Sequence, residues 1–246
     1  MVKLNFDIKK SILKNGLKVI TIKKDTKIAS VNVGVGIGAM YENLNEKGIS
    51  HFIEHMLFKG TSLRSNEKLN EELEYLGGEY NAYTDYDSTV YTISCLEEEI
   101  ENGIKLLGDM MINSNFPVEE IEKERSVILA EIRTSKDDIE DLSFKKTDEV
   151  AFEKSHLRYD VIGIEKNVDN FKRDDLLKFY NENYGPNNTI VTIVSSFEHD
   201  KALKLIEESF GNWERVNNRE RNIILEKNKN IEVTSYKNEI EQSTIV

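Results

Sequence analysis

One five-residue segment, His51-Phe52-Ile53-Glu54-His55, constrains the local fold more than any other part of the chain. On a helix, its three polar residues occupy positions i, i+3 and i+4 and project from one face. The apolar residues within the segment, together with Met56 and Leu57, supply the surface that such a helix would bury. Gly60 follows closely and is typical of a helix end. We therefore expect a helix over residues 46–59 with all three polar side chains on one side.

Two histidines and a glutamate on one helical face suit a hydrolytic zinc site. Imidazole nitrogens are common zinc ligands, and a catalytic zinc usually has three protein ligands and one open position. A glutamate beside the metal can take a proton from a metal-bound water. His51 and His55 are therefore candidate ligands, and Glu54 is the candidate base. On the residues alone, the alternative is that both histidines are ordinary polar residues of a helix surface or a core edge.

A third ligand has to come from another segment, and a second helical pattern offers candidates. Apolar residues recur at helical spacing over residues 118–139, directly after Pro117, and proline is common at helix starts. Glu124 and Glu131 lie two turns apart on this pattern and share a face. Spacing alone does not distinguish Glu131 from the other glutamates of the pattern, each of which is more typical of a solvated surface. Those other glutamates are Glu119, Glu120, Glu122 and Glu124.

The chain resembles the pitrilysin family of zinc peptidases, which includes insulin-degrading enzyme and the mitochondrial processing peptidases. The first matching stretch is residues 48–61, which contain the H-x-x-E-H pattern known as the inverzincin signature. The second is residues 124–132, which contain Glu131, 76 positions after His55. The glycine turn and strand at residues 76–84 and the run at 180–194 also match. Residues 10–215 as a whole resemble one family-type half, the N-terminal catalytic half.

The resemblance implies roles for five residues around the motif. His51, His55 and Glu131 match the family's three zinc ligands. Glu54 matches the base that activates the zinc-bound water. Glu124 matches a second glutamate of the catalytic site, which we expect to support the metal ligands from behind.

The resemblance also implies a substrate-binding strand. Asn81, Ala82 and Tyr83 match an edge strand against which the substrate backbone lies in an extended form. This mode of binding, β-augmentation, explains how such enzymes accept many sequences. From the residues alone, Asn81 could instead belong to the turn that follows Gly77 and Gly78.

The alternation of strand and helix patterns predicts an α+β fold, with an antiparallel sheet packed against helices on one face. Residues 89–94 and 189–194 are similar, and each is followed by acidic residues and a helical pattern. This similarity suggests two similar α+β units within the half that share the antiparallel sheet, although any strand-turn-helix unit would look alike. The strands are expected over residues 17–23, 28–37, 79–85, 88–95 and 188–195. The helices are expected over residues 46–59, 66–76, 98–113, 118–139, 140–154, 174–183 and 199–211.

Composition narrows the class of partner and the compartment. A net charge of −12 argues against a nucleic-acid-binding protein, which would present a basic face. The sequence has no apolar run as long as a membrane span. Cys95 is its one cysteine, which fits a reducing compartment, and the N-terminus resembles neither a signal nor a transit peptide. We therefore expect a cytoplasmic protein with no nucleic-acid or membrane partner.

Together these features predict a zinc-dependent endopeptidase that cleaves extended peptides or unfolded polypeptides. One alternative is a non-catalytic homologue that acts as a peptide-binding or partner subunit, and another is a small-molecule metal hydrolase or lyase. Family enzymes have two homologous halves, in one chain or as partner subunits. We therefore expect residues 1–246 to be a catalytic N-terminal half in which 241–246 begin the missing second half. Alone, it should bind zinc but cleave peptides poorly.

Overall fold

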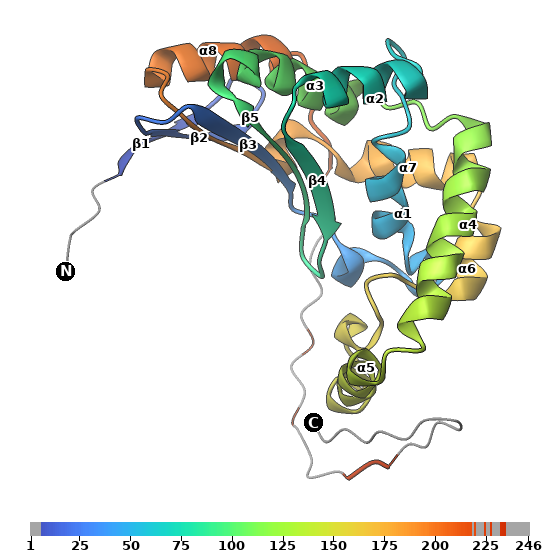
Figure 1. The fold of residues 1–246 in the computed structure, drawn as a ribbon. Helices are drawn as coiled ribbons and strands as arrows, with labels where there is room; N and C mark the ends of the chain where they lie inside the picture. Colours follow the sequence, from blue (N-terminus) through green and yellow to red (C-terminus); the bar gives the residue numbers. More distant parts are fainter. Residues whose placement is uncertain (1–5, 218, 220–223, 225–226, 228–231, 235–246) are drawn as a thin grey trace.

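The computed structural model describes residues 6–217, 219, 224, 227 and 232–234. The predicted start of a second half at residues 241–246 lies outside the described residues. Helices cover one face of a six-stranded sheet, and further helices extend beyond the β4 edge (Figure 1). The α+β class predicted from the sequence is confirmed.

The strands are ordered β1-β2-β6-β3-β5-β4 across the sheet. They are β1 (Asp7–Ile12), β2 (Lys18–Lys23), β3 (Ile28–Val35), β4 (Glu79–Thr84), β5 (Thr89–Leu96) and β6 (Thr189–Ser195). Every neighbouring pair is antiparallel except β2 and β6, which run parallel. The sheet is thus mixed, whereas the sequence predicted a wholly antiparallel sheet. A parallel pair needs a long crossover connection, and here most of the chain lies between the two strands.

The helices are α1 (Ile49–Met56), α2 (Asn66–Tyr75), α3 (Ile100–Asn113), α4 (Val118–Ser135), α5 (Ile139–Ala151), α6 (Glu165–Asn170), α7 (Arg173–Asn183) and α8 (His199–Phe210). Short 3₁₀ helices are η1 (Ala39–Tyr41), η2 (Leu44–Glu46), η3 (Glu97–Glu99), η4 (His156–Arg158) and η5 (Pro186–Asn188). Among the described residues, no helix combines the length and the apolar character needed to cross a membrane.

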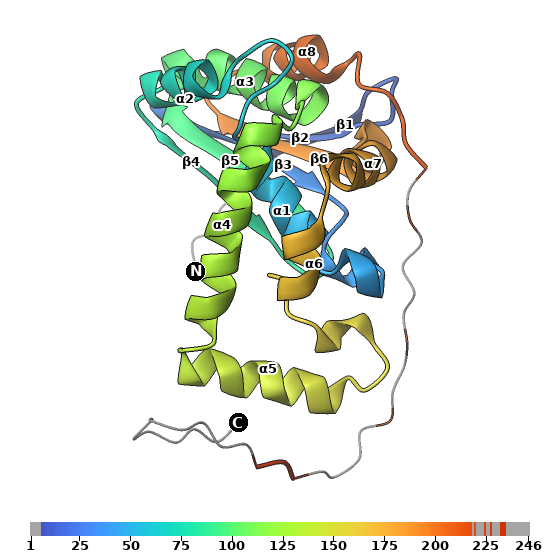
Figure 2. The same cartoon turned by 90° about the vertical axis from the view of Figure 1, so that its right-hand side faces the viewer.

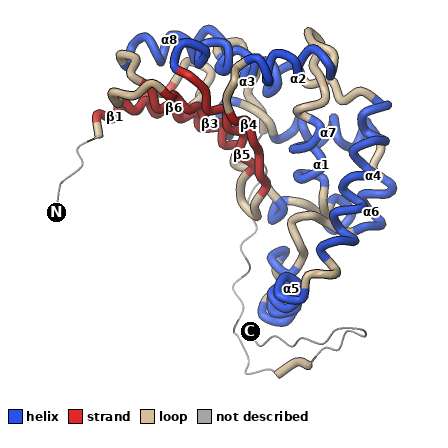
Figure 3. The backbone as a smooth tube through the Cα atoms, viewed as in Figure 1, coloured by secondary structure: helices blue, strands red, loops and turns tan. Residues whose placement is uncertain are grey.

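The core lies between the sheet and the helices α3 and α8 (Figure 3). Along β3, alternate residues from Ala29 to Val35 are fully buried, whereas the residues between them are only half-buried. This is the period-two pattern of a strand with one face against a core. Burying a valine or leucine side chain fully is worth roughly 1.5–3 kcal/mol, so this face is a major source of stability.

The two similar sequence segments occupy equivalent places in this single sheet. Strands β5 and β6 lie on either side of β3, and both pair with it antiparallel. Each leads into a helix, α3 or α8, and these two helices pack against each other. The similarity therefore corresponds to two strand–helix units that share one sheet.

Helix α1 is held between the sheet edge and the outer helices. It contacts β4 on one side, α4 on another and α7 on a third (Figure 2). Its apolar residues Phe52, Ile53 and Met56 are fully buried, so the helix cannot rotate without exposing them. This packing fixes which face of α1 is presented to α4.

Candidate metal centre

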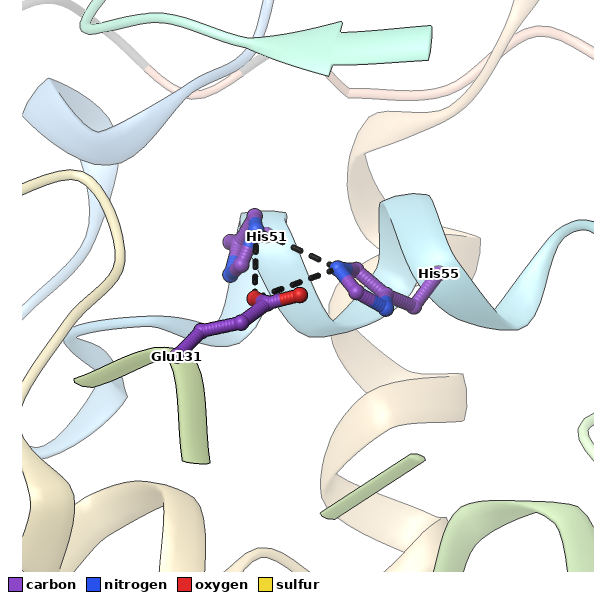
Figure 4. A group of neighbouring side chains, drawn as sticks. All are labelled: His51, His55 and Glu131. Atoms are coloured by element: carbon purple, nitrogen blue, oxygen red, sulfur yellow. Dashed lines mark hydrogen bonds and ion pairs between the residues drawn. The ribbon is translucent and has the colours of Figure 1, made fainter. Parts of the chain in front are cut away.

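Three of the predicted residues converge at the contact between α1 and α4 (Figure 4). His51 and His55 lie one turn apart on α1, and their Nε2 atoms are 3.3 Å apart. Glu131 comes from α4, and its Oε2 lies 3.8 Å from each of these two nitrogens. The side chains therefore form a small triangle with two nitrogen donors and one oxygen donor.

The spacing of these donors fits a zinc ion. Zinc–nitrogen bonds of about 2.0–2.1 Å in a tetrahedral site place two ligand nitrogens roughly 3.3 Å apart. The two imidazoles already have this separation. The carboxylate lies slightly farther away, but its side chain is 42% exposed and has room to close. Burial, together with the neighbouring His55, lowers the pKa of His51 to about 3, so its ring is neutral and has a lone pair for a metal.

Glu124 orients the second histidine. Its Oε2 lies 3.0 Å from Nδ1 of His55, and its Oε1 accepts from Nζ of Lys59 at 2.7 Å. Burial alone would raise the pKa of Glu124, but the bonds from His55 and Lys59 outweigh it and lower that pKa. A zinc-ligating histidine commonly donates its other ring N–H to such a carboxylate. Glu124 therefore directs the opposite nitrogen of His55 towards His51.

His51 lacks a comparable partner. Its Nδ1 is buried and has no hydrogen-bond partner among the described residues. The ring of His51 instead packs edge-on against that of His55, with centroids 4.7 Å apart. The position of His51 therefore depends on the backbone of α1.

Glu54 lies on the same helix and is held by the edge strand. Thr84, at the end of β4, donates its hydroxyl to Oε2 of Glu54 at 2.6 Å. Burial raises the pKa of Glu54 above its ordinary value, and this outweighs the Thr84 hydrogen bond and the neighbouring His55, which lower it. A carboxyl group with a raised pKa is suited to proton transfer near neutral pH.

The other glutamates of α4 take part in different interactions. Glu122 pairs with Arg125 on the same helix, and Glu120 bonds Asn66 and Lys123. The packing of α4 against α1, which spacing could not predict, brings Glu131 and Glu124 to the histidines.

Asn81, Ala82 and Tyr83 lie on β4, which forms one edge of the sheet. Asn81 pairs with Thr92 of β5 within the strand, so the alternative that it belongs to a turn is wrong. The Ala82 N–H donates to the side chain of Asn81 at 2.9 Å. Asn81 and Tyr83 are exposed, with Tyr83 at 55%.

Sequence reasoning missed three residues that support this centre. Two are Thr84 and Lys59, and the third is Glu42, whose buried carboxylate accepts from the backbone N–H groups of Gly48 and Ser50 at the start of α1. Thr84 could have been noticed because strand alternation places it on the same face as Ala82, towards the helices. Lys59 is one turn beyond His55, a spacing that brings side chains together near a helix end. Nothing in the sequence distinguishes Glu42 from the many exposed glutamates.

Comparison with known proteins places the chain in a family. Residues 18–164, more than half of the 246, match the family model described as Insulinase (Peptidase family M16). Residues 170–246 match the model described as Peptidase M16 inactive domain. The chain belongs to peptidase family M16. This confirms the resemblance to pitrilysin, insulin-degrading enzyme and the mitochondrial processing peptidases.

Individual M16 relatives agree with this assignment. An uncharacterized zinc protease of Rickettsia bellii is 36% identical over 209 residues, which cover 85% of this chain and 50% of that protein. The mitochondrial-processing peptidase subunit beta of Dictyostelium discoideum is 31% identical and is covered over 45% of its length, again with 85% of this chain. The M16 chain thus spans about half the length of these curated relatives.

Solved structures show the same fold. The first half of the periplasmic protease PqqL from Escherichia coli matches with a TM-score of 0.83 at 25% identity. The match covers 91% of this chain and 50% of that one. A protease from Helicobacter pylori matches with the same TM-score at 24% identity, over 89% of this chain and 53% of its own.

Proposed function

We propose that this M16 chain is the catalytic half of a zinc-dependent endopeptidase that cleaves extended peptides or unfolded polypeptides. Its family membership and its protease relatives support a peptidase in general. The observation that carries the finer proposal is the convergence of His51, His55 and Glu131 beside Glu54. A protein that only bound peptides would have no need of a glutamate at position 54.

In this proposal, His51, His55 and Glu131 hold the zinc ion. A bound zinc would supply Lewis-acid chemistry, since it lowers the pKa of a water and polarises a peptide carbonyl. Glu54 takes the proton from the attacking water and passes it to the leaving amine. Thr84 keeps the Glu54 carboxyl in place, and Glu124 keeps the ring of His55 in place.

The substrate would lie along β4. An edge strand has a free row of backbone groups, and an extended peptide can add to it as one more strand. Asn81, Ala82 and Tyr83 would form this edge. The hydroxyl of Thr84 ends the same strand and bonds Glu54, so a peptide paired with β4 would be led towards the base. Because pairing uses backbone atoms, it would accept many sequences.

We further propose that efficient cleavage needs a second homologous half, in the same protein or as a partner subunit. The support is that the curated relatives are about twice as long as the matched region, and that one of them is named as a subunit. Holding a substrate in a reactive geometry can lower a barrier by roughly 7–11 kcal/mol. A site formed by this half alone would provide only part of this barrier reduction.

A cytoplasmic location stays a prediction from the sequence.

The test combines metal content with turnover. Elemental analysis of the purified chain should find one zinc per molecule, and none in a His51→Ala, His55→Ala double variant. Cleavage of an unfolded fluorogenic polypeptide should be slow with the chain alone and faster by orders of magnitude when a second M16 half is added. Zinc binding without cleavage in either form would favour the non-catalytic homologue. Absence of zinc would refute the proposal.

A further inference from the structure

A buried carboxylate lies under the first turn of the metal-binding helix. Glu42 is fully buried, although charged residues are rarely so. Its Oε2 accepts from the backbone N–H of Gly48 at 3.0 Å, and its Oε1 accepts from that of Ser50 at 2.8 Å. The first N–H groups of any helix lack partners within the helix, and a negative charge there also interacts favourably with the helix dipole. Glu42 thus caps α1 from the segment that directly precedes the helix.

The surrounding residues fix this end of the helix as well. Lys47, also fully buried, donates to the carbonyl of Ala39 at 2.6 Å and lies over the ring of Tyr159. Gly48 has φ +101°, and Gly163 packs so close that a Cβ on it would lie 2.2 Å from the Cα of Gly48. The chain therefore enters α1 through a tightly packed point at which Glu42 provides two hydrogen bonds.

The residue that follows Ser50 is His51, and this adjacency gives the cap its importance. His55 is oriented by Glu124, but Nδ1 of His51 has no hydrogen-bond partner among the described residues. Besides its contacts with His55 and Glu131, the His51 ring is placed by the backbone of the first turn of α1, and Glu42 holds that turn.

We infer that Glu42 is a positioning residue for the metal: it fixes the first turn of α1 and so keeps Nε2 of His51 opposite Nε2 of His55. The inference rests on the proposed function, because it concerns zinc binding. Glu42 touches neither histidine and acts through the backbone N–H groups of Gly48 and Ser50.

The experiment measures the zinc dissociation constant of the chain by competition with a chelator. We choose pH 8 because burial raises the pKa of Glu42 to about 7, so the carboxyl is mostly ionised there. Glu42→Ala removes both acceptors and should raise the dissociation constant about 10–100-fold, the range seen when groups that orient metal ligands are lost. Glu42→Gln keeps one oxygen acceptor but turns an NH₂ towards the other N–H. It should show a smaller rise and carries the test if the alanine variant does not fold.

A matched control separates positioning from general stability. Glu97 also accepts from a backbone N–H and a hydroxyl, both of Ser196, but it lies in η3, away from α1. Glu97→Ala should lower the unfolding temperature and leave the zinc dissociation constant unchanged. An unchanged constant in both Glu42 variants, or an equal rise in Glu97→Ala, would overturn the positioning role alone. A wild-type chain that binds no zinc would overturn the proposed function as well.

Discussion

Replacing Thr84 with valine removes one hydrogen bond to the proposed base and preserves the shape of the side chain. The bond is short, 2.6 Å from the hydroxyl to Oε2 of Glu54. Hydrogen bonds to charged groups contribute about 1.5–3 kcal/mol. Because each 1.36 kcal/mol is a factor of ten in rate, losing a contribution of this size to the placement of Glu54 should lower kcat roughly 10–100-fold. Thr84→Ser keeps the hydroxyl and should retain most of the activity.

The pH profile gives an independent readout of the same change. The Thr84 bond lowers the pKa of Glu54, so its removal lets that pKa rise further. A general base must be ionised, and the acidic limb of the kcat profile should therefore move to higher pH in Thr84→Val. The assay is hydrolysis of a fluorogenic peptide by the chain with its second half, with zinc content measured in parallel. A valine variant with the wild-type rate and pH profile, or a serine variant as slow as valine, would refute this reasoning.

Three further changes test other parts of the site. Glu131→Ala should weaken zinc binding by at least about 100-fold, whereas Glu122→Ala on the same helix should not, since Glu122 pairs with Arg125; equal zinc retention would remove Glu131 from the ligand set. Ala82→Pro deletes the N–H of the edge strand that donates to the Asn81 side chain and should raise KM several-fold more than kcat falls. An unchanged KM would exclude β4 as the substrate strand. The pKa of Glu42 is raised to about 7 from an ordinary 4.5, so the unfolded chain releases this proton first as the pH rises. The unfolding free energy of the wild-type chain, measured by urea denaturation relative to that of Glu42→Gln, should therefore fall by about 3 kcal/mol between pH 4.5 and 8. A difference between the two chains that does not change with pH would contradict the burial of Glu42.

The sequence predicted the elements that bury a regular apolar pattern and missed those that do not. Strand β1 was not predicted because it is a mostly exposed edge strand and so has no regular buried apolar pattern. Its Ile8 and Ile12 side chains are 49% and 72% exposed. The short helix α6 buries only Val168, too little for a periodic signal. By contrast, β3 and α4 were predicted within a few residues of their ends, because alternation and helical spacing reflect burial directly.

The residues of the candidate site likewise fall into two groups: those that local spacing predicts and those that depend on tertiary packing. Helical spacing alone places His51, Glu54 and His55 on one face, because covalent geometry fixes it. Glu131 required the family resemblance, since its approach depends on how α4 packs against α1. The bond from Thr84 to Glu54 likewise depends on the tertiary placement of β4, which no local pattern encodes.

The most direct test of the central claim is the Glu54→Gln variant of this chain, assayed together with the proposed second M16 half. The amide preserves the size of the side chain and can still accept from Thr84, but it cannot take a proton from the attacking water. We predict that this variant binds one zinc per chain with wild-type affinity and keeps its unfolding temperature. Its kcat for peptide cleavage should fall by at least about 100-fold, the scale of general-base catalysis. A variant that retains zinc and a near-normal kcat would show that Glu54 is not the base and would contradict the proposed mechanism.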